Sequence, residues 1–177
     1  AALPPVADWR ARPEVADLFE EQRRRCGRPA ADLEPAARLV HLAYTTPVDL
    51  GGGIIPALAA ARPALREMEF LYPIPERAHA LLSDRRTGDS RIAPSWTIER
   101  GAIKGCVDFL FEHDGRVFVC DWKSDVLPSY GGAALDEHCR EHYDVQARLY
   151  TMAALRMCGI EDRAAFARRF GGMLFVF

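Results

Sequence analysis

The sequence predicts an α/β fold in which helices flank a mixed central β-sheet. Three observations carry this prediction: two β-rich runs joined by a tight turn, a long helical segment after them, and an apolar strand at the end of the chain. Of the 177 residues, 49% are apolar and 27% are charged, which is typical of a globular protein. This composition excludes a disordered, collagen-like or coiled-coil chain. No apolar run is long enough to span a membrane.

The N-terminal part is expected to form short, broken helices, because ten of the twelve prolines lie at or before Pro75. The predicted elements are, in order, helices over 13–25, 34–43 and 57–65 (the last interrupted at Pro63), a strand over 67–74, and a short helix over 78–82 followed by a mobile loop. We expect residues 1–66 to form a helical, proline-rich lead-in and residues 67–177 to form the core of the domain.

A β-hairpin is the clearest local signal. Residues 103–112 and 117–123 are rich in β-branched and aromatic side chains, and Asp114-Gly115 lies in the turn between them. If these two residues form the centre of the turn, counting back along both strands places Asp108 opposite Asp121, with their side chains on the same face. Lys123 lies two residues further along and projects from that face as well.

The segments after the hairpin complete the α/β pattern. We predict a loop over 128–132, a long helix over 134–157 that ends before Gly159, a short helix over 163–170 and a final strand over 173–177. The helix over 134–157 is long enough to cover one face of the sheet.

Two facing carboxylates repel each other unless a proton or a cation lies between them. Mg²⁺ suits such a pair, because it prefers oxygen ligands and keeps waters that phosphate oxygens can replace. The Lys123 ammonium can offset charge in the transition state, so the arrangement suits phosphodiester hydrolysis. The alternative is a solvated ion triad on a half-exposed hairpin. The heavily apolar residues around Asp108 and Asp121 favour an interior strand pair instead.

The charge and cysteine content agree with an intracellular enzyme. There are 23 basic and 25 acidic residues, so the chain is not a passive nucleic-acid coat, although a local patch can still meet DNA. Only two of the basic residues are lysines, Lys104 and Lys123. The five cysteines are spread out and contain no C-x-x-C, which favours free thiols in a reducing cytoplasm over disulfides or a zinc site.

Four segments carry a resemblance to a known family. The segment 105–124, G-x-x-D-F-L-F-x-x-D-G-R-V-F-V-C-D-W-K-S, resembles the nuclease core of the PD-(D/E)XK superfamily, and more narrowly the C-terminal nuclease domains of the RecB subunit of bacterial exodeoxyribonuclease V. H-Y-D-V-Q-A-R-L-Y-T-M-A-A-L resembles the Tyr-x-x-Gln-x-x-x-Tyr helix of that family. R-R-F-G-G-M-L-F-V-F resembles its closing strand, and R-E-M-E-F-L-Y-P-I resembles the strand that carries its acid. The resemblance covers about residues 65–177.

The resemblance implies a restriction-endonuclease-like core and assigns roles to individual positions. Asp108, Asp121 and the backbone carbonyl of Trp122 would bind the metal, Lys123 would be the catalytic lysine, Glu67 rather than Glu69 would be the strand acid, and Gln146 and Tyr150 would complete the helix motif. Glu67 is preferred because it lies three residues before Phe70. By periodicity alone, the helix positions also fit a face packed on the sheet.

The implied activity is metal-dependent DNA hydrolysis within a larger bacterial helicase–nuclease that acts on double-strand ends in the cytoplasm. The implied cofactor is Mg²⁺, with Mn²⁺ substituting and Ca²⁺ binding without turnover. The implied partners are DNA, the helicase portion of the same parent chain and further subunits. The family site also uses a histidine in a Gly-x-x-x-His helix. His41 lacks that glycine and His79 follows the strand, so we expect the histidine helix to precede Ala1.

Two other functions compete with the nuclease. A fold of this type can serve as a catalytically weak DNA-holding or docking module. The motif His138-x-x-Glu141-His142 matches the inverted zincin pattern, in which two histidines on one helix share a zinc ion. Zinc dependence would identify that protease. Arginine-rich segments at 23–25, 85–91 and 168–169 could contact phosphates or simply form solvated faces.

Overall fold

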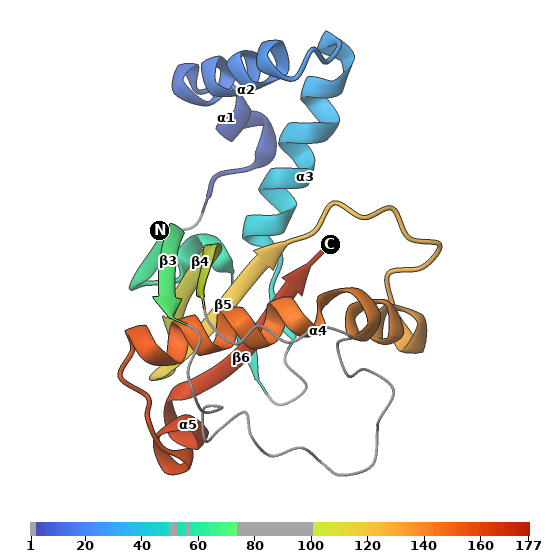
Figure 1. Ribbon diagram of the computed structural model, residues 1–177. Coiled ribbons are helices and arrows are strands. Elements are labelled where there is room, and N and C mark those ends of the chain that lie inside the picture. Colours follow the sequence, from blue (N-terminus) through green and yellow to red (C-terminus); the bar gives the residue numbers. More distant parts are fainter. Residues whose placement is uncertain (1–2, 50–52, 56, 74–100) are drawn as a thin grey trace. The chain divides into compact units, whose positions relative to one another are not determined.

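The computed structural model describes residues 3–49, 53–55, 57–73 and 101–177 (Figure 1). The chain divides into two compact units, Ala1–Ala61 and Arg62–Phe177. The predicted helix over 78–82, its loop, His79 and the arginine-rich segment 85–91 lie outside the described residues.

The first unit is mainly helical. Its elements are α1 (Val6–Arg10), α2 (Pro13–Arg25), η1 (Ala30–Asp32), α3 (Leu33–Thr45), β1 (Val48–Asp49), β2 (Ile54–Ile55) and η2 (Leu58–Ala60). The helices predicted over 13–25 and 34–43 are confirmed. Helix α2 starts on Pro13, whose missing N–H costs nothing in the first turn of a helix.

The helix predicted over 57–65 is wrong. Only the single 3₁₀ turn η2 forms there, and the chain is already a strand from Ala64 onward. Ala64 and Leu65 pair with Phe111 and Leu110 of the hairpin. Pairing with an apolar strand therefore overrides the local helix-forming composition.

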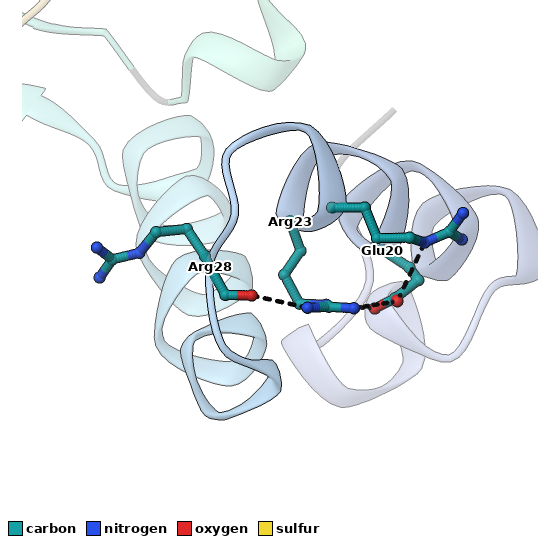
Figure 2. Close-up of polar contacts among 4 residues, drawn as sticks. Glu20, Arg23 and Arg28 are labelled. Atoms are coloured by element: carbon teal, nitrogen blue, oxygen red, sulfur yellow. Dashed lines mark hydrogen bonds and ion pairs between the residues drawn. The ribbon is translucent and has the colours of Figure 1, made fainter.

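The end of α2 is held by a small arginine network (Figure 2). Glu20 accepts hydrogen bonds from Arg23 and Arg24, and Arg23 Nη1 donates to the carbonyl oxygen of Arg28 at 2.7 Å. The bond from Arg23 lowers the pKa of Glu20 to about 2. The guanidinium of Arg23 is thus engaged within its own unit, where it ties the last turn of α2 to the segment that leads to α3.

The second unit contains a mixed four-stranded sheet with two helices. Its elements are β3 (Ala64–Pro73), β4 (Ala102–His113), β5 (Arg116–Trp122), α4 (Gly132–Met157), α5 (Arg163–Arg169) and β6 (Phe170–Val176). The strand order is β3-β4-β5-β6; the first two pairs are antiparallel and β5 pairs with β6 in parallel. The predicted α/β class with a mixed sheet and flanking helices is confirmed, as are the strands and helices predicted over the described residues of this unit.

The turn of the β4–β5 hairpin has the predicted geometry. Asp114 and Gly115 have φ values of 49° and 71°, as a type I′ turn requires at both central residues. The strands then pair from His113 with Arg116 up to Phe109 with Cys120, in the predicted register.

Both faces of the sheet carry apolar residues. On one face, α4 runs across the strands (Figure 1), and its residue Ala154 packs into a core cluster with residues of β4 and β5, namely Val107, Leu110 and Val119. On the other face, Phe111 stacks on Phe118, with ring centroids 5.4 Å apart. The Phe118 ring lies directly over Gly171 of β6, where a side-chain Cβ would collide with it.

No helix in the described part of the chain has the length and apolar character needed to cross a membrane.

Candidate active site

The ladder of backbone hydrogen bonds breaks at Asp108. On the β3 side, pairing skips Asp108 and its opposite residue Glu67, which has a φ of 48°. On the β5 side, pairing runs from the turn to Phe109 with Cys120 and stops before it reaches Asp108. Asp108 Oδ2 instead accepts a hydrogen bond from the backbone N–H of Trp122 at 2.9 Å. The side chain of Asp108 thus takes the place of a backbone acceptor.

Asp121 and Lys123 form a buried ion pair. Asp121 is only 4% exposed, and its Oδ2 lies 2.5 Å from the Lys123 ammonium. The backbone N–H of Lys123 donates to the carbonyl oxygen of Val176 at 2.8 Å, so β6 fixes the main chain at this point. The predicted placement of both side chains on one face is confirmed.

Gln146 of α4 joins this pair into a closed ring of contacts. The Lys123 ammonium donates to Gln146 Oε1 at 2.6 Å, and Gln146 Nε2 donates to Asp121 Oδ1 at 2.9 Å. The Gln146 amide therefore bonds both to the positively charged Lys123 and to the negatively charged Asp121. Through these bonds the helix motif contacts the sheet motif directly. Tyr150, one turn further along α4, packs edge-to-face on Phe70 of β3 with ring centroids 5.6 Å apart. Gln146 and Tyr150 therefore share the face of α4 that packs on the sheet.

The pKa of the Asp121 carboxyl is changed by its burial and by two neighbouring charges. Burial raises the pKa of the Asp121 carboxyl, the Lys123 ammonium lowers it, and the neighbouring charge of Asp108 raises it again. The Asp108 carboxylate bonds to the backbone of Trp122, the residue after Asp121, but Asp108 and Asp121 do not form the predicted pair in the ladder. A buried carboxylate beside a second carboxylate is stable only if a proton or a cation lies close by.

The two candidate strand acids differ in position. Glu67 lies opposite Asp108 at the break in the ladder, and its Oε2 is 3.8 Å from Cys106 Sγ. Burial, and after it the charges of Glu67 and Asp108, raise the pKa of the Cys106 thiol. Glu69 instead points to Lys104, 3.9 Å away, and is exposed. Glu67 therefore lies opposite Asp108 in the sheet, whereas Glu69 lies opposite Cys106.

A second layer of polar residues surrounds Lys123, and no role at this site was predicted for these residues from the sequence. The ring of Tyr143 lies 3.9 Å from the Lys123 ammonium, and the Tyr143 hydroxyl donates to Asp125 Oδ2 at 2.5 Å. His138 Nε2 faces Asp125 Oδ1 at 3.6 Å. Tyr143 could have been noticed, because it opens the helix motif, whereas Asp125 carried no signal beyond its place four residues after Asp121.

The donor set around the break fits a hard divalent ion only in part. Carboxylate oxygens are the ligands that Mg²⁺ prefers. Within the described residues, however, no group of three His, Cys, Asp or Glu side chains could hold a metal ion. The zinc motif also lacks a complete set of ligands. The rings of His138 and His142 lie on α4 with centroids 4.5 Å apart, and the described ranges contain no third side chain that would complete a metal site with them.

The other basic segments bind within the protein where they are described. Arg169 donates to the carbonyl oxygens of Cys158 and Gly159 at the end of α4, at 2.8 and 3.5 Å. Arg23 and Arg24 are paired with Glu20. These three arginines therefore have structural partners.

The sheet, its flanking helices and the order of its strands define a restriction-endonuclease-like α/β protein. No protein-family model matches the chain. Among curated proteins, the chain is similar to the RecBCD enzyme subunit RecB of Haemophilus influenzae, with 30% identity over 142 residues, which is 75% of this chain and 12% of the relative. The same subunit of Escherichia coli is 33% identical over 139 residues, or 71% of this chain and 12% of the relative.

RecB of Borreliella burgdorferi is 27% identical over 119 residues, which cover 63% of this chain and 10% of the relative. The chain is therefore a RecB-like domain, and the short share of the relatives that it spans fits a C-terminal nuclease domain.

Proposed function

We propose that the chain is the nuclease domain of a larger RecB-like helicase–nuclease and that it hydrolyses DNA phosphodiester bonds with the help of a divalent metal ion. The observation that carries the proposal is the buried ring of Asp121, Lys123 and Gln146 beside Asp108, in a RecB-like domain. A buried carboxylate, a buried ammonium and a second carboxylate provide both the charge that holds a cation and the charge that meets a phosphate.

Asp108, Asp121 and the backbone carbonyl of Trp122 would hold the metal ion, with Mg²⁺ as the cofactor, Mn²⁺ as a substitute and Ca²⁺ as a ligand that does not support turnover. When bound, such an ion lowers the pKa of a water molecule and polarises the phosphate. Because no group of three His, Cys, Asp or Glu side chains in the described residues could hold the ion, we propose that a third side-chain ligand comes from a histidine helix elsewhere in the parent chain.

The residues of this chain have separate tasks in the proposed reaction. Lys123 offsets the charge that develops on the phosphate, because its ammonium is already desolvated and needs little reorganisation. Gln146 keeps that ammonium at a fixed distance from Asp121 through its two hydrogen bonds. Tyr150 supports Gln146 from the next turn of α4, and Glu67 adds negative charge from β3 opposite Asp108.

The proposed setting follows from the relatives. The chain spans 12% of the two RecB proteins that it matches at 30% and 33% identity, so the helicase portion would lie in the same parent polypeptide. We propose double-strand DNA ends as the substrate, further subunits of a RecBCD-type complex as partners, and the bacterial cytoplasm as the location. ATP would be consumed by the helicase portion.

A DNA-holding or docking module is the second candidate function. It is favoured by one observation: the described residues contain no group of three His, Cys, Asp or Glu side chains that could hold a metal ion. The intact set of Asp108, Asp121 and Lys123 argues against it, because a module that only holds DNA does not need a buried acid beside a second acid.

The test is cleavage of linear double-stranded and single-stranded DNA by the parent polypeptide with Mg²⁺, Mn²⁺ or Ca²⁺. Lys123→Ala should lower the rate by about 10³-fold, by analogy with the loss of one group that stabilises transition-state charge, and should spare Mn²⁺ binding in isothermal titration. Lys104→Ala is the matched control, because Lys104 is the other lysine and its ammonium lies 3.9 Å from exposed Glu69. Residues 1–177 alone should cleave weakly or not at all.

Three results would decide against the nuclease. Wild-type rates in Lys123→Ala, or no cleavage by the parent polypeptide with any of the three ions, would contradict it. DNA binding that is flat between low and physiological salt would also count against it, since phosphate contacts release counterions. His142→Ala should leave cleavage intact, whereas the zinc protease would lose its activity.

A further inference from the structure

The Lys123 ammonium lies over two aromatic rings that pack on each other. Its nitrogen is 3.9 Å from the ring centroid of Tyr143 and 5.2 Å from that of Phe175. The Lys123 side chain is 10% exposed, so little water competes with the rings for the charge. A cation over the face of a ring within about 6 Å is attracted by the ring quadrupole, and the attraction grows with desolvation.

The Tyr143 ring is itself held in place. Its hydroxyl donates to Asp125 Oδ2 at 2.5 Å, and its ring packs on Phe175 of β6 with centroids 5.1 Å apart. The bond to Asp125 raises the pKa of Tyr143 to about 12 and lowers the pKa of Asp125. At neutral pH the hydroxyl therefore stays a proton donor. The bond ties the loop after β5, at Asp125, to α4 at Tyr143.

The three N–H groups of the Lys123 ammonium can now be matched with three partners. Asp121 lies at 2.5 Å, Gln146 accepts at 2.6 Å, and the Tyr143 ring face lies at 3.9 Å. Lysine has a flexible stem with four rotatable bonds, so two polar contacts alone leave it room to swing. The Tyr143 ring blocks movement of the Lys123 ammonium on the side that these two contacts leave open.

We propose that Tyr143 is a positioning residue for Lys123: its ring face, held by Asp125, keeps the ammonium against Asp121 and Gln146. The consequence for catalysis rests on the proposed hydrolytic function, whereas the placement of the ammonium does not. The two parts can therefore be tested separately.

The placement is tested by NMR on the chain of 177 residues labelled with ¹³C-lysine. Because the chain has two lysines, two sets of ε-methylene signals are expected. The Lys123 signal should be shifted upfield by the ring current, and the signal of exposed Lys104 should serve as the internal reference. In Tyr143→Leu the Lys123 signal should move toward the Lys104 position, and in Tyr143→Phe, which keeps the ring, it should remain upfield.

The proposal is overturned if the two lysine signals coincide in the wild-type chain, or if Tyr143→Leu leaves the Lys123 signal upfield. The wild-type spectrum and Tyr143→Phe decide the matter even if Tyr143→Leu does not fold. Phe166→Leu is the matched control: Phe166 stacks on Phe170, at the opposite end of β6 from Phe175.

The catalytic consequence is measured in the parent polypeptide. Tyr143→Leu should lower kcat about tenfold with little change in KM for DNA, the size expected for one desolvated cation–π contact. Tyr143→Phe should recover most of that loss, and Phe166→Leu should match the wild type. An upfield Lys123 signal without DNA cleavage by the wild type would refute the proposed function and leave the placement standing. Cleavage with wild-type kcat in Tyr143→Leu would refute the positioning role.

Discussion

The two ends of the β4–β5 hairpin are built on different principles. At the closed end, from the turn to the pair of Phe109 and Cys120, the backbone ladder is regular and the buried side chains are apolar. At the open end the ladder stops, and the buried groups are a carboxylate and an ammonium. Apolar burial at the closed end stabilises the fold. At the open end, moving charged groups out of water costs part of that free energy.

Hydrogen-bond alternation makes the difference concrete. In a regular antiparallel ladder with a two-residue turn, every second pair counted from the turn exchanges both backbone hydrogen bonds. Continued from His113 and Arg116, that alternation would direct the N–H of Trp122 to the carbonyl of Val107. The N–H of Trp122 bonds to the Asp108 carboxylate instead. A side chain has thus replaced the strand at the point where the candidate site begins.

The largest expected effect comes from removing the buried acid at the open end. Asp121→Ala in the parent polypeptide should lower the rate of DNA cleavage by about 10³-fold or more and remove most Mn²⁺ binding, because both the proposed ligand and the partner of Lys123 are lost. Cleavage assays and isothermal titration measure the two effects. Glu112→Ala, an exposed acid at the closed end, should change neither. Equal losses in both variants would erase the distinction between the two ends.

The next effect is expected at the closed end and concerns stability. Phe111→Ala should lower the free energy of unfolding by about 3–5 kcal/mol, as is usual when a buried aromatic ring is removed. Phe111 is 2% exposed, and its ring stacks between those of Phe109 and Phe118. Leu65→Ala, on the neighbouring strand and half exposed, is the control and should cost less than about 1.5 kcal/mol. Urea denaturation followed by circular dichroism measures both, and a similar loss in the two variants would contradict the assignment.

The smallest effect tests the replacement of backbone by side chain. Asp108→Ala leaves the N–H of Trp122 without its acceptor and should cost about 1–3 kcal/mol of unfolding free energy. Asp108→Asn keeps an acceptor oxygen and should cost less, although both variants should lose metal binding. Hydrogen exchange of the Trp122 amide should speed up in the alanine variant and stay slow in the asparagine variant. Equal exchange rates in the two variants would show that the bond does not hold the strand.

The closed end was predictable from the sequence because its information is local. Asp114-Gly115 selects the turn, the turn sets the register, and the register carries Asp121 and Lys123 to one face. The long helix over 134–157 was predicted from its length and its stop at Gly159 and begins two residues earlier, at Gly132. The roles of Asp108, Asp121, Lys123, Glu67, Gln146 and Tyr150 in catalysis and metal binding remain predictions.

The open end was less predictable because its contacts join segments that sequence spacing does not relate. The positive φ of Glu67 and the skipped pair with Asp108 depend on how three strands meet. The bond between Tyr143 and Asp125 joins a helix to a loop through packing on Phe175. The first two residues of the strand that starts at Ala64 were assigned to a helix for the same reason, since their partners lie far along the chain.

The scarcity of lysine has a practical consequence for handling the protein. Of the two lysine side chains, Lys104 is 69% exposed and Lys123 is 10% exposed and enclosed by Asp121, Gln146 and two rings. Among side chains, an amine-reactive fluorophore or crosslinker should therefore attach at one position on β4. Conjugation at Lys104 gives a defined attachment point for surface immobilisation or single-molecule work without engineering a cysteine into a chain that already has five.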